Sequence, residues 1–241
     1  MGKSIIKTIK IFAITNCILL SNCLGQIGSG SLEDLAFKDY ETGTLKDGYK
    51  EGIWEYYDNP SELSLKVNYD NGQLLYLIPD TSAYAIKINN EWVYSKLDMQ
   101  PRYIGSMVEF YKILYTNIQY PNEAKSNSTA GQFYITFEID TLGYSANFIA
   151  LNDIGDNCSE EIIRAIKLIP NFWLSATKDK IKYVAKFILP IKFEMEVDGK
   201  AIAARKRKGA SELLLPPAKS LETIKIKVAG FTREETKYLT R

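Results

Sequence analysis

Residues 131–193 constrain the fold of this 241-residue chain more than any other stretch. Residues 131–139 alternate apolar and polar side chains, which predicts a half-buried strand, and Asp140–Gly143 predicts a turn into a returning strand. Residues 159–169 carry an apolar stripe at helical spacing and end before a proline, and residues 183–193 alternate again. This order predicts an α+β fold: a ββαβ module with a three-stranded antiparallel sheet and a helix.

The last strand, residues 183–193, is expected at the edge of that sheet. Pro190 lies inside it and has no N–H for a ladder hydrogen bond, so such a strand is normally an edge strand. Lys182, Lys186 and Lys192 lie on the face opposite the apolar one, where they either block uncontrolled pairing or select a partner. An open edge can accept an extended segment as an added strand.

Residues 41–96 are expected to be antiparallel β-structure. Residues 63–69 alternate with period two and lead into Asp70–Gly72, a strong hairpin turn. Residues 84–88 and 92–94 are expected to pair across Asn89 and Asn90.

Composition argues against most catalytic chemistry. The chain has no histidine, which removes the commonest general base, the usual nucleophile pairs and most zinc sites. We therefore expect no enzymatic activity, no catalytic or metal-binding residues and no cofactor. The net charge of +1 gives no field that favours nucleic acid. Cys158, the one cysteine outside the N-terminal segment, is expected to be buried and structural.

The N-terminal residues 1–25 are typical of a secretory signal. Three lysines precede a short apolar run at 11–20, and small residues before Gln26 fit a cleavage site. We expect a periplasmic protein. The alternative is a lipid anchor at Cys23.

Residues 52–57 contain a glycine, a tryptophan and paired tyrosines, and residues 69–72 form a Tyr-x-x-Gly turn. This region resembles MORN-type repeats, and the match covers two units. The resemblance implies a stacked hairpin surface; any aromatic-rich meander is the alternative.

Residues 99–194 resemble the C-terminal domain of TonB-type energy transducers. The matching features are Gln119-Tyr120-Pro121 with Ala124, Gly131-Gln132, the turn at 140–143, Glu160-Glu161, Ile169-Pro170 with Trp173, and Leu189–Phe193. The resemblance implies a periplasmic module that adds a segment of an outer-membrane receptor beside its last strand. The partner-binding residues it implies are Gln119, Tyr120, Pro121, Tyr183, Val184, Ala185, Lys186, Phe187 and Ile188.

The chain departs from that family in two ways. The residues after Trp173 lack the usual Trp-x-Pro-Gly pattern, and the chain shows neither an inner-membrane anchor nor a proline-rich spacer. We therefore expect an exported protein-binding module of the TonB-dependent transport type without its own motor. A homodimer formed by strand exchange is a further possibility. The alternative function is an envelope adaptor that binds through its MORN-like region.

Four segments are expected along the chain. These are a signal peptide (1–25), a MORN-like region (26–98), a TonB-like domain (99–195) and a basic, proline-containing extension (196–241). The extension contains one further alternating stretch, residues 223–228, which predicts a strand.

Overall fold

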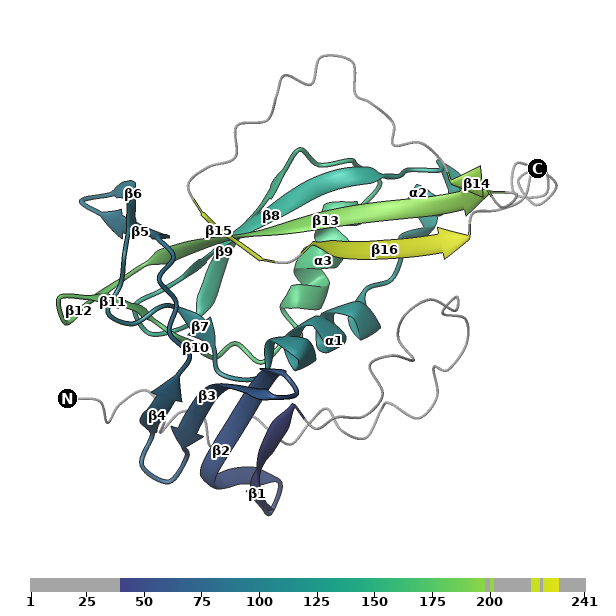
Figure 1. Cartoon of the computed structure of the whole chain (residues 1–241). Helices are drawn as coiled ribbons and strands as arrows, with labels where there is room; N and C mark the ends of the chain where they lie inside the picture. Colours follow the sequence, from purple (N-terminus) through teal and green to yellow (C-terminus); the bar gives the residue numbers. More distant parts are fainter. Residues whose placement is uncertain (1–39, 198–199, 202–217, 222, 230–241) are drawn as a thin grey trace. The chain divides into compact units, whose positions relative to one another are not determined.

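A computed structural model describes residues 40–197, 200–201, 218–221 and 223–229 (Figure 1). The predicted signal peptide and the lipid-anchor alternative at Cys23 lie outside these residues. The fold is α+β, with mostly antiparallel sheets and few helices, as predicted. The described residues divide into two compact units, one built from 40–80 plus 103–111 and the other from 81–102 plus the described residues from 112 to 229. The division falls inside the helix α1 (Met107–Asn117).

The first unit contains a four-stranded antiparallel meander in the order β1-β2-β3-β4. Its strands are β1 (Glu41–Lys46), β2 (Tyr49–Asn59), β3 (Glu62–Asn68) and β4 (Gln73–Leu77). Trp54 and Tyr56 on β2 lie opposite Val67 and Leu65 on β3, and all four are buried. The β3–β4 turn contains Gly72 at a φ of 74°, the left-handed region that the predicted hairpin requires.

The second unit is built on an eight-stranded sheet whose main path runs β6-β5-β13-β8-β9. Its strands are β5 (Tyr84–Ile88), β6 (Glu91–Ser95), β8 (Gly131–Ile139), β9 (Ser145–Leu151), β13 (Ala185–Val197), β14 (Lys200–Ala201), β15 (Lys219–Ser220) and β16 (Ile224–Ala229). The remaining elements are β7 (Arg102–Tyr103), α2 (Asn122–Ser126), α3 (Cys158–Ile166), β10 (Trp173–Leu174), β11 (Ala176–Lys178) and β12 (Ile181–Tyr183).

The predicted ββαβ succession is present as β8, β9, α3 and β13, but its sheet is larger than three strands. The apolar faces of β8 and β13 form the core together with the buried side of α3, which packs against β8 (Figure 1). The core aromatic rings are stacked: Phe137 lies 5.5 Å from Phe187 and 5.7 Å from Phe148, measured between ring centroids.

The predicted boundary between residues 98 and 99 differs from the division in the structure. The hairpin β5–β6 forms through the expected Asn89–Asn90 turn, both residues having positive φ, yet it belongs to the second unit. Ile86 pairs with Ala185 at the start of β13, and the N–H of Lys87 donates to the carbonyl of Val184 at 2.9 Å. A non-local pairing of this kind leaves no trace in the local pattern of the hairpin.

The start of the predicted helix also differs. Helix α3 begins at Cys158, one residue before the predicted stretch at 159–169, because Asn157 adopts a left-handed φ of 61° at the N-cap. Pro121 stands at the N-cap of α2.

Candidate protein-binding site

The rim of β13 is not open, which corrects the predicted edge. β13 pairs with β8 along Ala185–Phe193 on one side. On its other side the chain's own C-terminal segment runs parallel to it, with β15 opposite Phe187 and Ile188 and β16 opposite Ile191–Glu196 (Figure 1). We call residues 218–229, as far as the structure describes them, the tail strand.

Pro190 explains why the tail strand is interrupted. It lies opposite Tyr134 in the β8 ladder, and because it has no N–H, its peptide nitrogen must face away from β8. The tail therefore meets no donor there, and its register shifts by one residue between Ser220 and Ile224. The proline that predicted an edge instead marks a break in the neighbouring strand.

Backbone groups and one buried side chain hold the tail strand in place. The N–H of Leu221 donates to the carbonyl of Ile188 at 2.8 Å, and Ile224 is fully buried. The N–H of Ala218 donates to the Tyr94 hydroxyl at 3.1 Å, and the N–H of Lys225 donates to the Tyr115 hydroxyl at 3.3 Å. The alternation at 223–228 predicted the strand, but nothing local predicted its place beside β13.

The charge pairing across this rim is unfavourable at one position. Lys192 lies opposite Lys225, and both side chains are exposed. Like charges directly opposite one another destabilise a strand pair. Lys192 also lies 2.5 Å from Glu194 on its own strand, which offsets part of that repulsion.

The structure does not bring the predicted partner-binding residues together on an open surface. Tyr120 is buried, its hydroxyl donates to the carbonyl of Thr129 at 2.5 Å, and its ring lies 4.8 Å from that of Phe193. The N–H of Gln119 donates to Glu161 at 2.6 Å, and Pro121 caps α2. These contacts give the 119–121 segment a packing role.

The other predicted positions, 183–188, are already paired. Tyr183 lies opposite Ala176, and Ala185 lies between Ile139 and Ile86. Phe187 and Ile188 lie between β8 and β15. The ammonium of Lys186 lies 4.0 Å from the centre of the Trp92 ring, a cation–π contact.

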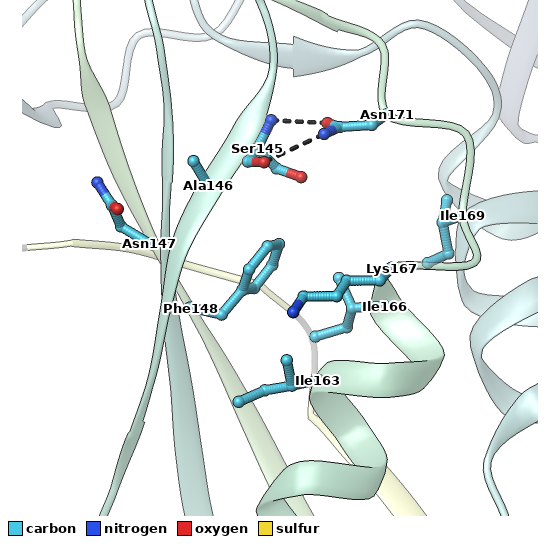
Figure 2. Close-up of a pocket in the computed structure, with 9 residues that line it drawn as sticks. All are labelled: Ser145, Ala146, Asn147, Phe148, Ile163, Ile166, Lys167, Ile169 and Asn171. Carbon is cyan, nitrogen blue, oxygen red and sulfur yellow. Dashed lines mark hydrogen bonds between the residues drawn. The ribbon is translucent and has the colours of Figure 1, made fainter.

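A hollow of ≈ 590 Å³ lies beside β9, the strand that ends the sheet path, between β9 and α3 (Figure 2). Its lining comes from β9, from α3 and from the segment after α3: Ser145, Ala146, Asn147, Phe148, Ile163, Ile166, Lys167, Ile169 and Asn171. Figure 2 shows the Phe148 ring reaching from the strand toward the helix, with Asn171 and Ser145 hydrogen-bonded to each other at one end of the hollow. Sequence reasoning missed this site, because its residues have no motif and meet only in the fold.

Asp156 and the other acidic residues near α3 have structural partners. Asp156 accepts hydrogen bonds from Asn127 and Thr129, and Glu161 accepts from Arg164 at 2.7 Å. Within the described residues no group of three or more metal-ligating side chains occurs. Burial, with Asp153 and Asp156 nearby, raises the pKa of the Cys158 thiol to about 12, which opposes thiolate formation.

No family model matches this chain, and neither the curated proteins nor the solved structures contain a match to it. None of the helices in the described ranges has the length and apolar character needed to cross a membrane.

Proposed function

We propose that this chain is an exported, non-enzymatic binding module that takes up an extended segment of another protein beside β13, in exchange for its own tail strand. An open-rim mechanism is incompatible with the paired rim described above. Exchange keeps the chemistry that the resemblance to TonB C-terminal domains implies, namely main-chain hydrogen bonds from β13 to an added strand. In this mechanism the tail strand competes with the partner segment for the place beside β13.

One observation carries the proposal: the rim is already occupied by a strand, and that strand fits imperfectly. The tail brings a lysine opposite Lys192 and shifts register beside Pro190. A partner segment with a carboxylate opposite Lys192 and an aliphatic residue in the place of Ile224 would keep the burial and remove the like-charge pair. We propose a segment of an outer-membrane receptor in the periplasm as this partner.

The experiment compares two neighbouring substitutions in the full chain. Ile224→Asp places a charge in a fully buried position and should release the tail strand. Lys225→Asp places a carboxylate opposite Lys192, and the resulting ion pair should hold the tail strand more firmly. The probes are a labelled peptide of residues 218–229 carrying Asp at 225, and peptides from the N-terminal segments of outer-membrane receptors. Fluorescence anisotropy measures their affinity for each protein.

We expect Ile224→Asp to bind the probes more tightly than the unchanged chain, and Lys225→Asp to bind them less tightly, by about twofold to fivefold. Equal affinity for all three proteins would contradict the exchange. Circular dichroism confirms that each variant keeps its fold, so that a loss of binding is not mistaken for unfolding.

A second copy of the chain is another source for the same strand. Cysteines introduced together at Lys192 and Lys225 would join paired residues of β13 and β16, while Cys158 is buried. After oxidation, a cross-linked monomer on a non-reducing gel indicates that the tail pairs within one chain. A covalent dimer indicates strand exchange between copies.

The second candidate function is the envelope adaptor, in which the MORN-like region binds the partner. Ile53 and Tyr76 favour it, because they are 48% and 39% exposed on one sheet, on the face opposite its buried core. The substitutions Ile53→Asp and Tyr76→Asp should abolish capture of an envelope partner under this function. Under strand exchange at β13 they should leave probe binding unchanged.

A further inference from the structure

The strand β9 is the outer strand of the second sheet. β9 ends the path of the second sheet, and within the described residues only β8 pairs with it. An unpaired edge normally carries protective features, such as charged side chains or a covering loop. On β9 a register shift at Asn147, which has a left-handed φ of 54°, protects one part of the edge, whereas Ile149 beyond it is 56% exposed.

Pro190 sets which peptide groups of β9 face outward. Its pair with Tyr134 cannot be hydrogen-bonded, so Ile135 turns its peptide groups toward β13, and Tyr134 and Thr136 turn theirs toward β9. Ala150 lies opposite Ile135 and therefore presents its N–H and carbonyl away from the sheet. Ser145 presents its own in the same direction.

Asn171 already occupies one position of this outward ladder. The N–H of Ser145 donates to the Asn171 side-chain oxygen at 2.6 Å, and the Asn171 amide nitrogen donates to the Ser145 carbonyl at 3.1 Å (Figure 2). A primary amide that accepts and donates to one residue reproduces the two hydrogen bonds of an added strand. This edge therefore forms ladder bonds with a group outside the sheet.

The hollow beside the edge selects the side chains of an added strand. Its apolar wall comes from Phe148, Ile163, Ile166 and Ile169. Lys167 is exposed and is the one charged residue in the lining. A side chain that packs against this wall is apolar, and a carboxylate two residues further along the added strand, on the same face, reaches the Lys167 ammonium.

We propose that the β9 edge and the hollow form a second binding surface, for an extended segment of another protein that carries an aliphatic residue and, two positions later on the same face of the strand, an acidic one. The aliphatic side chain enters the hollow against Phe148 and Ile163, and the carboxylate pairs with Lys167. The backbone of the segment bonds to Ala150 and replaces Asn171 at Ser145. Binding at this site does not require displacement of the tail strand, so this proposal can be tested independently of strand exchange at β13.

The test uses the full chain and a designed heptapeptide, acetylated and amidated, with the sequence Thr-Val-Thr-Leu-Thr-Asp-Thr, in which Leu and Asp share one face of the strand. A control peptide has Lys in place of Asp. Two-dimensional NMR follows the amides of Ser145 and Ala150 and those of residues 163–171 as each peptide is added. We expect shift changes confined to these residues, with dissociation constants on the order of 1 mM.

Charge reversal tests the role of Lys167. Lys167→Glu should weaken binding of the aspartate peptide about threefold and strengthen binding of the lysine peptide by a similar factor. Lys182→Glu, on the exposed strand β12, is the matched control and should change neither affinity. Equal effects of the two substitutions would overturn the assignment of Lys167.

Asn171 provides the second test. Asn171→Ala frees both Ser145 groups and should strengthen peptide binding, and Asn171→Asp, which can accept but not donate, should show a smaller gain. The Asp variant covers the case in which the Ala variant loses the packing of β9. An absence of shift changes at Ser145 and Ala150 at about 1 mM peptide in all these proteins would overturn the proposal.

Discussion

The two units have interiors of different chemistry. In the first, the Lys50 ammonium lies 4.1 Å from the centre of the Trp54 ring and 2.6 Å from a carboxylate oxygen of Glu41, and it donates to the Tyr56 hydroxyl at 3.1 Å. In the second, the sheet buries stacked phenylalanines and aliphatic side chains. A small four-stranded sheet has few apolar residues, and aromatic rings around one ion complete its interior. The first unit should therefore respond more steeply to alkaline pH.

High pH should produce the largest effect, in the first unit. Burial raises the pKa of Tyr69 to about 12 and also raises the pKa values of Tyr56 and Tyr103 above the ordinary value. These phenols stay neutral in the folded unit while they ionise in the unfolded chain, so their stabilisation is present below pH 10 and is lost above it. Each lowers the free energy of unfolding by about 1.4 kcal/mol per pH unit.

Hydrogen exchange measured by mass spectrometry between pH 9 and 12 follows the peptides of β2 and β13 separately. We expect β2 to lose protection more steeply above pH 10. Cys158, with its raised pKa, and Tyr120 give the second unit a shallower loss, which begins near pH 9. Tyr69→Phe should remove one of the three tyrosine contributions to the pH dependence of the first unit. If the loss of β2 protection with pH is equally steep in this variant, the explanation is wrong.

The next largest effect should come from the hydrocarbon core of the second unit. Phe137 is buried, and its ring lies within 6 Å of the rings of Phe148, Trp173 and Phe187. Phe137→Ala should cost about 3–5 kcal/mol, because it removes apolar contacts and leaves a cavity. Urea unfolding at pH 7 measures the loss. Protection of β2 that falls as far as that of β13 would contradict two separate cores.

A smaller effect is expected from Lys50. Burial lowers the pKa of Lys50, although the nearby Glu41 carboxylate acts in the opposite direction. Lys50 therefore increases the free energy of unfolding as the pH rises toward 10.5. At pH 7, Lys50→Met leaves the Glu41 carboxylate without its ion pair and should cost about 1–3 kcal/mol. The matched control is Lys46→Met, whose side chain is 68% exposed and pairs with Glu51 at 3.5 Å, and it should cost almost nothing.

The double variant Glu41→Gln with Lys50→Met completes a double-mutant cycle for this ion pair. It should recover part of the loss, since no charge is then left without a partner. Additive losses would show that the two side chains do not interact.

The smallest effect should come from a surface pair of the first unit. Glu55 lies 2.7 Å from Lys66 across β2 and β3, and both side chains are about 30% exposed. Glu55→Gln should therefore change the free energy of unfolding at pH 7 by less than about 1 kcal/mol. A larger loss would mean that surface charge, and not the Lys50 cluster, supplies the polar stabilisation of this unit.

Local chemistry made much of the second unit predictable. The alternation at 131–139 and 183–193 identified β8 and β13, and Asn89–Asn90 identified the β5–β6 turn. Gly143 has a φ of 90°, and a Cβ there would lie 2.1 Å from the carbonyl oxygen of Trp173, so the turn needs a glycine. Signals of this kind act between residues close in sequence.

The candidate sites were less predictable for the same reason. Pro190 correctly indicated a missing donor, but an absent N–H is equally compatible with open solvent and with a neighbouring strand that shifts register. The hydrogen bond between Ser145 and Asn171 joins residues that are 26 positions apart in the sequence. No local pattern encodes it.

The sequence by itself determined the α+β class, the strands and helices and most turns, because φ preferences and side-chain periodicity are local properties. Only the tertiary structure decided the neighbours of each strand: the tail strand beside β13, the β5–β6 hairpin in the second unit and the hollow between β9 and α3. Strand pairing joins peptide groups that are alike at every residue, so its specificity comes from burial and from side chains brought together over long sequence separations.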